Sequence, residues 1–432
     1  MTRKTRGAAL TALGASAALA FTACSTSTEA GTEGGDGQNV TLTVWHNNTS
    51  GEKGPKFWQD TKAAFEAENP NVTIEIVPVT NEDLDGKLQT AMNGGAPPDV
   101  FLQRGGGKLA EMVEAGMVLD ITDQIDAPGI PEGAYAADTL DGKIYAMPMT
   151  VQPGGIFYSK DLFEQAGITE VPETIEDLNE AVTKLKAAGI APVALGAKDA
   201  WPAAHWFYWF ALRECSSETL ETASNEADLS DPCFLKAGED LKAFADTEPF
   251  QEGFLTTGAQ NAADTADGLI ANHKAAMQLM GSWMPGTVGS LTPDQEPLPD
   301  LGFFPFPTVE GGEGEPGSMM AGVDGFSCSS MAPQEECVAF LNFLGAKEQQ
   351  AAFATANNAI PASSEAADVV KLPVLKEVQG LYEKSPYVSQ WLDTRLGSSI
   401  GNGLNTGVVD MLAGKGSPQG IIDAAAAAAA KG

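Results

Sequence analysis

The sequence predicts an α/β protein of two domains, each built on a mainly parallel sheet flanked by helices. Two observations predict this. The chain has 432 residues, which is more than one hydrophobic core usually spans. The segments after residue 40 also alternate between a strand period of two and a helical period of about 3.6. Alternation of strand and helix favours parallel pairing, because each helix returns the chain to the edge where the next strand begins.

The first strands and helices follow one another closely. Alternating apolar residues predict strands at 40–46 and 72–79, and the run "VFL" predicts a third at 100–102. Helices are predicted at 54–68, with one apolar face, and near 84–92. In a parallel sheet, ligands bind at the loops after the carboxyl ends of the strands. These loops begin at His46-Asn47-Asn48, Thr80-Asn81-Glu82 and Gln103-Arg104-Gly105.

Later segments continue the same pattern. Residues 141–168 are predicted to form a turn, extended segments and a helix. "PETIEDLNEAVTKLKAAGI" has a helix start at Thr174 and a stop at Gly189. The remaining predictions are a strand in "APVALGA", a helix in "AAHWFYWFAL", an apolar strand ending at Gly281-Ser282-Trp283, a helical pair across 333–362, and a helical end in the alanine run 424–430.

The N-terminus is typical of an export signal. Arg3, Lys4 and Arg6 precede an uncharged stretch of small residues that closes at "FTAC". This resembles the lipobox of bacterial lipoproteins, whose cysteine is acylated, although Phe21 departs from the usual Leu. We therefore predict a signal peptide at 1–23 and lipidation of Cys24, with a plain secretion signal as the alternative. Residues 24–39 are polar and Gly-rich and are predicted to be a flexible tether.

Charge and cysteine content exclude several functions. The formal net charge of −33 disfavours nucleic acid and anionic lipid headgroups as ligands. Beyond Cys24, an even number of cysteines in an exported protein suggests two disulfides. Three connectivities are open, and we favour the near pairs, Cys215–Cys233 and Cys328–Cys337. A zinc site is disfavoured, because the spacings are not CxxC and the chain has three histidines. No metal or cofactor is expected.

The sequence lacks the common nucleotide-binding and serine-hydrolase motifs. "GGGK" is not a phosphate-binding loop, since Leu109 rather than Ser or Thr follows Lys108. The glycines are better explained by a close backbone approach. No G-x-S-x-G is present. A glycoside hydrolase with two carboxylates remains an alternative, although no pattern singles out a pair among 58 acidic residues.

Aromatic residues are concentrated in "GAKDAWPAAHWFYWF". The later rings are expected in the core of a helix, as is Trp58. Trp201 and His205, at the helix entry, are candidate ligand contacts. The apolar face of a sugar ring packs flat on Trp, while its hydroxyls need paired donors and acceptors such as Arg104. These residue types therefore suit a saccharide.

The mature chain as a whole resembles the extracellular solute-binding proteins of bacterial ABC sugar importers. The resemblance rests on the order and spacing of several blocks: "LTVWHNN", "NEDLDGKLQTAMNGGAPPDVFLQRGGGKLAEMVEAG", "DGKIYAMP", "GGIFYSKDLFEQAGI", "LGAKDAW" and "AAMQLMGSW". It implies a hinged, two-lobed fold of the periplasmic-binding-protein type II, which closes on a sugar and delivers it to a membrane permease without catalysis. We place the first lobe at 40–149 and 310–360 and the second at 150–309 and 361–432.

Within that family, "QRGGGK" and "GAKDAWPAAHW" resemble the actinobacterial xylobiose- and xylo-oligosaccharide-binding lipoproteins. The resemblance implies an extracellular, lipid-anchored monomer. Cello-, malto- or chito-oligosaccharides are alternative ligands, and a peptide or siderophore is a third class. The residues implied to contact the ligand are His46, Asn48, Glu82 and Arg104 on the first lobe, Lys198, Trp201, His205 and Trp283 on the second, and Asp324, Trp391 and Arg395 from "GVDGF" and "WLDTR".

Overall fold

Strands from both halves of the chain join one large sheet in the computed structural model, which describes residues 39–431. A separate two-stranded sheet is formed by β4 and β5. The strands are β1 (Val40–His46), β2 (Val72–Pro78), β3 (Val100–Gln103), β4 (Thr139–Leu140), β5 (Lys143–Ile144), β6 (Met147–Ser159), β7 (Ala191–Val193), β8 (Ala275–Gly281), β9 (Leu301–Phe304), β10 (Met319–Cys328), β11 (Ile360–Pro361) and β12 (Val388–Ser389).

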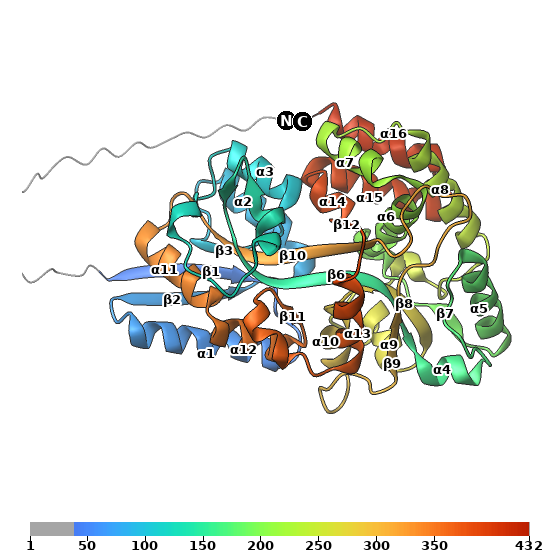
Figure 1. Ribbon diagram of the computed structural model, residues 1–432, viewed down its shortest axis with the longest axis horizontal. Coiled ribbons are helices and arrows are strands. Elements are labelled where there is room, and N and C mark those ends of the chain that lie inside the picture. Colours follow the sequence, from blue (N-terminus) through green and yellow to red (C-terminus); the bar gives the residue numbers. More distant parts are fainter. Residues whose placement is uncertain (1–38, 432) are drawn as a thin grey trace, which may run out of the picture. The chain divides into compact units, whose positions relative to one another are not determined.

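Helices cover this sheet along its length (Figure 1). They are α1 (Lys53–Glu68), α2 (Asn81–Asn93), α3 (Gly106–Glu114), α4 (Lys160–Gln165), α5 (Ile175–Ala187), α6 (Trp201–Glu214), α7 (Ser217–Glu226), α8 (Pro232–Ala245), α9 (Ala266–Ala271), α10 (Met284–Gly289), α11 (Gln334–Gly345), α12 (Lys347–Asn357), α13 (Pro373–Tyr382), α14 (Leu392–Arg395), α15 (Ser398–Leu412) and α16 (Pro418–Ala429). Short 3-10 turns lie at η1 (Thr122–Gln124), η2 (Glu132–Asp138), η3 (Ala197–Asp199), η4 (Phe254–Thr256) and η5 (Ser364–Val369).

The α/β class is confirmed, and the sheet is more mixed than the sequence predicted. The strand order is β2-β1-β3-β10-β6-β8-β7. Pairs β1–β2, β1–β3 and β7–β8 are parallel, whereas β6 is antiparallel to β8, β9, β10 and β11. The physical reason is the connection. None of the partners of β6 is joined to it by a single crossover helix: β8 is reached only after α4, α5, β7 and several further helices, so nothing imposes parallel pairing on them.

Two long strands, β6 and β10, lie side by side across the middle of the sheet (Figure 1). The first half of β6 pairs with β10 and β11, and its second half pairs with β8 and β9. β6 therefore takes part in both ends of the sheet, while β10 pairs with β3 on its other side. Gln152 of β6 and Asp324 of β10 lie opposite neighbouring positions where these two strands pair.

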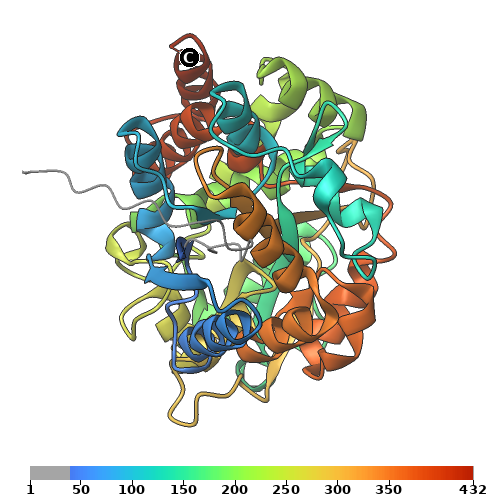
Figure 2. The ribbon, with the colours of Figure 1, turned by 90° about the vertical axis from the view of Figure 1, so that its left-hand side faces the viewer.

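A hydrophobic core lies at each end of the sheet. One contains buried residues between 42 and 151 and between 326 and 362. The other contains buried residues between 156 and 320 and between 360 and 425. In the first core, α1 lies beside α12 although the two are far apart in the sequence (Figures 1 and 2). Phe57 packs edge-on against Phe353 with ring centroids 5.1 Å apart, and Trp58 is fully buried, as predicted.

Local sequence signals explain the ends of several helices. Thr174 caps α5, accepting from the backbone N–H of Asp177 while the Asp177 carboxylate accepts from the backbone N–H of Thr174. The buried stripe of α5 consists of Leu178, Ala181, Val182 and Leu185. In α6, every residue from Pro202 to Glu214 is buried, so the later rings of the aromatic segment belong to the core. None of the helices between residues 39 and 431 has the length and apolar character needed to span a bilayer.

Candidate functional site

A cavity of about 630 Å³ lies between the loops that follow β1, β2 and β3 and segments from the later half of the chain. Its position agrees with the expectation that ligands bind after the carboxyl ends of parallel strands. One side of it is lined by Asn47, Asn48, Asn81, Glu82, Asp85, Arg104, Lys108, Gln152 and Asp324, and the other by Trp201, His205, Trp283, Trp391, Asp393 and Asn405.

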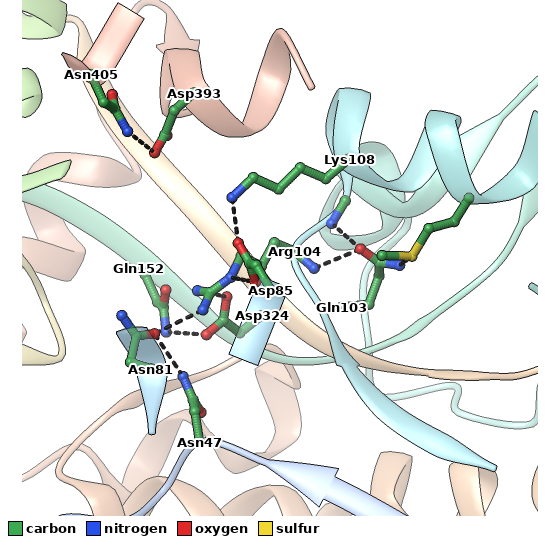
Figure 3. A network of polar contacts seen from close by, with 12 residues as sticks. Asn47, Asn81, Asp85, Gln103, Arg104, Lys108, Gln152, Asp324, Asp393 and Asn405 are labelled. Atoms are coloured by element: carbon green, nitrogen blue, oxygen red, sulfur yellow. Dashed lines mark hydrogen bonds and ion pairs between the residues drawn. The ribbon is translucent and has the colours of Figure 1, made fainter. Parts of the chain in front are cut away.

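The first wall is a network of polar side chains around Arg104 (Figure 3). Its guanidinium donates from Nε to Asp85 at 3.3 Å and from a terminal nitrogen to the Asn81 amide oxygen at 2.7 Å. The other terminal nitrogen lies 3.8 Å from a carboxylate oxygen of Asp324. Lys108 donates to the second oxygen of Asp85 at 2.7 Å. These partners hold the planar Arg104 guanidinium in one orientation. The polar side chains of this wall are therefore fixed in place before any ligand binds.

Charge compensation differs between the two carboxylates of this wall. Partial burial alone would raise the pKa of Asp85, but the charges of Arg104 and Lys108 outweigh it and hold that pKa well below its usual range. Burial raises the pKa of Asp324 above its usual value, and the charge of Arg104 offsets only part of this rise. Asp324 also accepts from the Gln152 amide at 3.2 Å, so its orientation is fixed from β6.

The second wall is a cluster of four aromatic side chains, which we call the aromatic wall: Trp201, His205, Trp283 and Trp391. His205 stacks on Trp391 with ring centroids 4.2 Å apart and an interplanar angle of 9°. Trp283 meets Trp391 edge-on at 6.0 Å and approaches Trp201 at 6.2 Å. Trp201 and Trp283 are half-buried, whereas Trp391 and His205 are 6% and 3% exposed. The wall therefore has two recessed rings and two more accessible ones.

Glycines on the strands make room for these rings. A Cβ on Gly154 of β6 would lie 2.4 Å from the Trp391 ring, and one on Gly281 would lie 1.9 Å from the Trp283 ring. Both distances are too short for any side chain, so the backbone must be bare at these positions. The glycines of "GGGK" act in the same way. Cβ atoms on Gly106 and Gly107 would collide with Gln390 and with the backbone around Arg395.

Burial keeps the histidine of the aromatic wall neutral. It lowers the pKa of His205 to about 4, so the ring carries no charge at neutral pH. The Nδ1 atom of His205 and the indole nitrogens of Trp201 and Trp391 have no hydrogen-bond partner among residues 39–431. The core indoles of Trp206 and Trp209 share this property, so it does not by itself mark a ligand site.

Polar contacts join the two walls at the rim of the cavity. The Gln260 amide donates to Glu82 at 3.3 Å, and Lys53 forms an ion pair with Glu296 at 2.7 Å. The Ser50 hydroxyl contacts the Asn261 amide oxygen. Each contact links the loop after β1, the start of α1 or the start of α2 to a loop more than 170 residues later. The rim is therefore bridged on this side.

The structure brings eight of the eleven predicted ligand-contact residues to the cavity: Asn48, Glu82, Arg104, Trp201, His205, Trp283, Asp324 and Trp391. The other three do not line it. His46 is 1% exposed and stacks on Trp58, with its Nδ1 accepting from the Asn48 backbone. Lys198 is exposed outside the lining. Arg395 forms an ion pair with Glu221 and approaches the Tyr387 hydroxyl.

Several lining residues escaped the sequence reasoning. Asn81 and Asp85 share the first turns of α2 with Glu82, so helical spacing could have found them. Lys108 lies in the first turn of α3, whereas Arg104 precedes this helix, so no helical period links the two. Gln152 lies in the middle of β6, and no sequence signal marks it. The predicted disulfides Cys215–Cys233 and Cys328–Cys337 are both formed. The signal peptide, Cys24 and all but the last residue of the tether lie outside the described residues.

The chain is similar in sequence and in structure to several known proteins. The family model for bacterial extracellular solute-binding proteins matches residues 48–351. An ABC transporter extracellular-binding protein of Pyrococcus horikoshii is 28% identical over 335 residues, covering 75% of this chain and 72% of its own. The diacetylchitobiose-binding protein of Streptomyces coelicolor is 26% identical, covering 84% and 83%. A protein solved in work on xylan utilization by Caldanaerobius polysaccharolyticus has a TM-score of 0.80 at 25% identity, covering 89% and 98%.

Proposed function

The chain belongs to the bacterial extracellular solute-binding protein family, and from this premise we propose that it captures an oligosaccharide for an ABC importer. The observation that carries the proposal is the pairing of two unlike walls. The aromatic wall faces the cavity from one side, and the Arg104 network faces it from the other. A sugar ring needs both, because it has an apolar face and a belt of hydroxyls.

The ligand that we propose is a short, uncharged oligosaccharide, with xylobiose or a xylo-oligosaccharide as the first choice. A cavity of about 630 Å³ is within the size range of small-molecule sites, so it suits a short chain rather than a polymer. The relative associated with xylan utilization supports this choice, and the diacetylchitobiose-binding relative supports a chito-oligosaccharide as the alternative. Cello- and malto-oligosaccharides complete the set to be tested.

The proposed mechanism is closure of two lobes on the sugar. We assign residues 40–149 and 310–360 to the first lobe and 150–309 and 361–432 to the second, with β6 and β10 connecting them. Sugar contacts to both walls stabilise the closed form, as differential binding requires. The rim contacts of Glu82 with Gln260 and of Lys53 with Glu296 would form only when the lobes approach.

The last step of the proposed function is delivery of the bound sugar to the permease. We place the protein outside the cell, held to the membrane by a lipid on Cys24, as a monomer that docks on the permease of the importer. The tether at 24–39 would give the folded part reach above the membrane. Export also accounts for two disulfides in a chain of this size, since such bonds persist in oxidising surroundings.

Isothermal titration calorimetry tests the proposal. The purified protein is titrated with xylo-, cello-, malto- and chito-oligosaccharides of two to four units. We expect one saccharide per chain, with the strongest binding in the xylo series. If no sugar of this panel binds below millimolar concentration, the proposal is wrong. Prolonged incubation followed by chromatography checks for cleavage, and the appearance of shorter sugars would point to a hydrolase instead.

A further inference from the structure

Three metal-ligating side chains meet at a second place in the fold, away from the cavity. They are Asp161, His273 and Asp300, and none of them lines the cavity. One ligand atom from each lies within 4.8 Å of the other two. The imidazole Nε2 of His273 is 3.0 Å from a carboxylate oxygen of Asp300.

The topology of the sheet explains why these residues meet. Strand β6 ends at Ser159 and leads into α4, which carries Asp161. Strand β8 begins just after His273, and β9 begins just after Asp300. Because β6 is antiparallel to both β8 and β9, its end lies at the same edge of the sheet as their beginnings. The three ligands therefore come from three segments that the sheet holds in register (Figure 1).

Contacts from outside the cluster fix the central carboxylate. The hydroxyl of Ser159 donates to the Asp300 carboxylate, and the backbone N–H of Lys160 donates to the Asp300 carbonyl at 2.9 Å. The Asp300 side chain is only 9% exposed. Ligating carboxylates in metal sites are commonly oriented by such outer hydrogen bonds. Asp161 forms no ion pair with Lys160 or Lys274 among residues 39–431, so its carboxylate is available.

The ligand chemistry selects the class of ion. We propose that Asp161, His273 and Asp300 bind a divalent transition-metal ion of the Zn²⁺ class. Zn²⁺ accepts imidazole nitrogen and carboxylate oxygen at about 2.0–2.2 Å, so two ligand atoms on one ion lie roughly 3.3 Å apart. Asp161 is exposed, so its side chain has the rotational freedom to approach the other two ligands. Ca²⁺ and Mg²⁺ prefer oxygen ligands only, so the imidazole selects against them.

The exposure of the three histidines shows which imidazole can bind a metal ion. The chain has three histidines, and His46 and His205 are 1% and 3% exposed. His273 is the exposed one. Any imidazole-dependent binding of metal to the folded protein must therefore use His273. An ion held there would join the ends of three strand-linked segments, so it should raise the stability of the folded state and leave sugar affinity unchanged.

Titration of the full, metal-stripped chain with ZnCl₂ tests the inference by calorimetry, alongside thermal unfolding. We expect one Zn²⁺ to bind at this cluster and to raise the Tm, with affinity lowered at least about tenfold in both Asp161→Asn and His273→Gln. Glu164→Gln is the matched control, because it removes the same charge from the same short helix without touching the cluster. CaCl₂ should reproduce neither the heat nor the Tm shift.

Four outcomes would overturn the inference. The first three are no Zn²⁺ binding by the wild type, equal binding by wild type and His273→Gln, and loss in His273→Gln with full binding in Asp161→Asn. The fourth is an equal loss of affinity in Glu164→Gln, which would show that general surface charge causes the effect. Saccharide titrations of the same variants separate this inference from the proposed function, since neither substitution touches the cavity.

Discussion

His205 and Trp391 stack face to face across two distant parts of the chain, with ring centroids 4.2 Å apart. His205 comes from the start of α6, and Trp391 directly precedes α14. The Trp391 ring in turn lies against the bare backbone of Gly154 in β6. The Trp391 ring of this stack also meets Trp283 edge-on, so the aromatic wall packs as one unit rather than as a set of separate rings.

The first prediction concerns Trp283, one of the two more accessible rings of the aromatic wall. Trp283→Ala should weaken oligosaccharide binding by about 1–3 kcal/mol, the range for losing an aromatic anchor. Trp283→Phe should recover part of this loss, because a smaller ring keeps some of the contact with the sugar face. Calorimetry with the best sugar of the panel measures both. Leu255→Ala, exposed and outside the cavity lining, serves as the control. Unchanged affinity in Trp283→Ala would remove this ring from the site.

The second prediction concerns the fork of Arg104. Arg104→Lys keeps the charge but cannot reach Asn81 and Asp85 together, so the polar wall should lose its fixed geometry. We expect sugar affinity to fall about tenfold, equivalent to about 1.4 kcal/mol. Arg395→Lys is the matched control, since Arg395 pairs with Glu221 outside the cavity. Equal losses in the two variants would show that the effect is not specific to the cavity.

The third prediction concerns a buried carboxyl group in α9. Asp267 is 1% exposed, and one of its oxygens accepts from the Gln278 amide at 2.9 Å. The other oxygen, and the amide oxygen of Gln278, have no partner among residues 39–431. Burial raises the pKa of Asp267 to about 7, and the charge of Glu82 adds to this rise. The protonated form is therefore favoured in the folded state.

The raised pKa of Asp267 makes the free energy of unfolding depend on pH. Between about pH 4 and 7 the folded protein keeps a proton on Asp267 that the unfolded chain has lost. The contribution of Asp267 to folding stability should therefore fall as pH increases, by up to about 1.4 kcal/mol per pH unit. Asp267→Asn does not titrate, and its amide can donate to Gln278. The variant should therefore gain stability relative to wild type across this window.

Urea unfolding of wild type and Asp267→Asn at several pH values measures this difference. The exposed Asp264→Asn controls for general charge effects. A stability difference between wild type and Asp267→Asn that stays constant from pH 4 to pH 7 would contradict the prediction.

The fourth prediction concerns the disulfides. Cys215→Ser with Cys233→Ser opens a loop with a sequence separation of 18 and should lower the free energy of unfolding by about 3 kcal/mol. The pair Cys328→Ser and Cys337→Ser opens a separation of 9 and should cost somewhat less. Denaturant unfolding compares the two variants. Sugar affinity should persist in both at low temperature, because none of the four cysteines lines the cavity.

The sequence by itself determined the local structure. Hydrophobic periodicity located β1, α1, β2 and α5, because one buried face leaves a regular pattern along the chain. Cysteine spacing and an even count indicated the two disulfides. The loops after the first three strands also pointed to one wall of the cavity, since the ends of parallel strands share an edge.

Only the tertiary structure decided the pairing of distant segments. The mixed direction of the sheet depends on how β6 and β10 are reached, which periodicity does not record. The same limit explains His46 and Arg395. Each has the residue type of a sugar contact, but His46 stacks on Trp58 and Arg395 pairs with Glu221. Which face a side chain turns toward a cavity is fixed by packing against residues far away in the sequence, so only folding of the whole chain selects it.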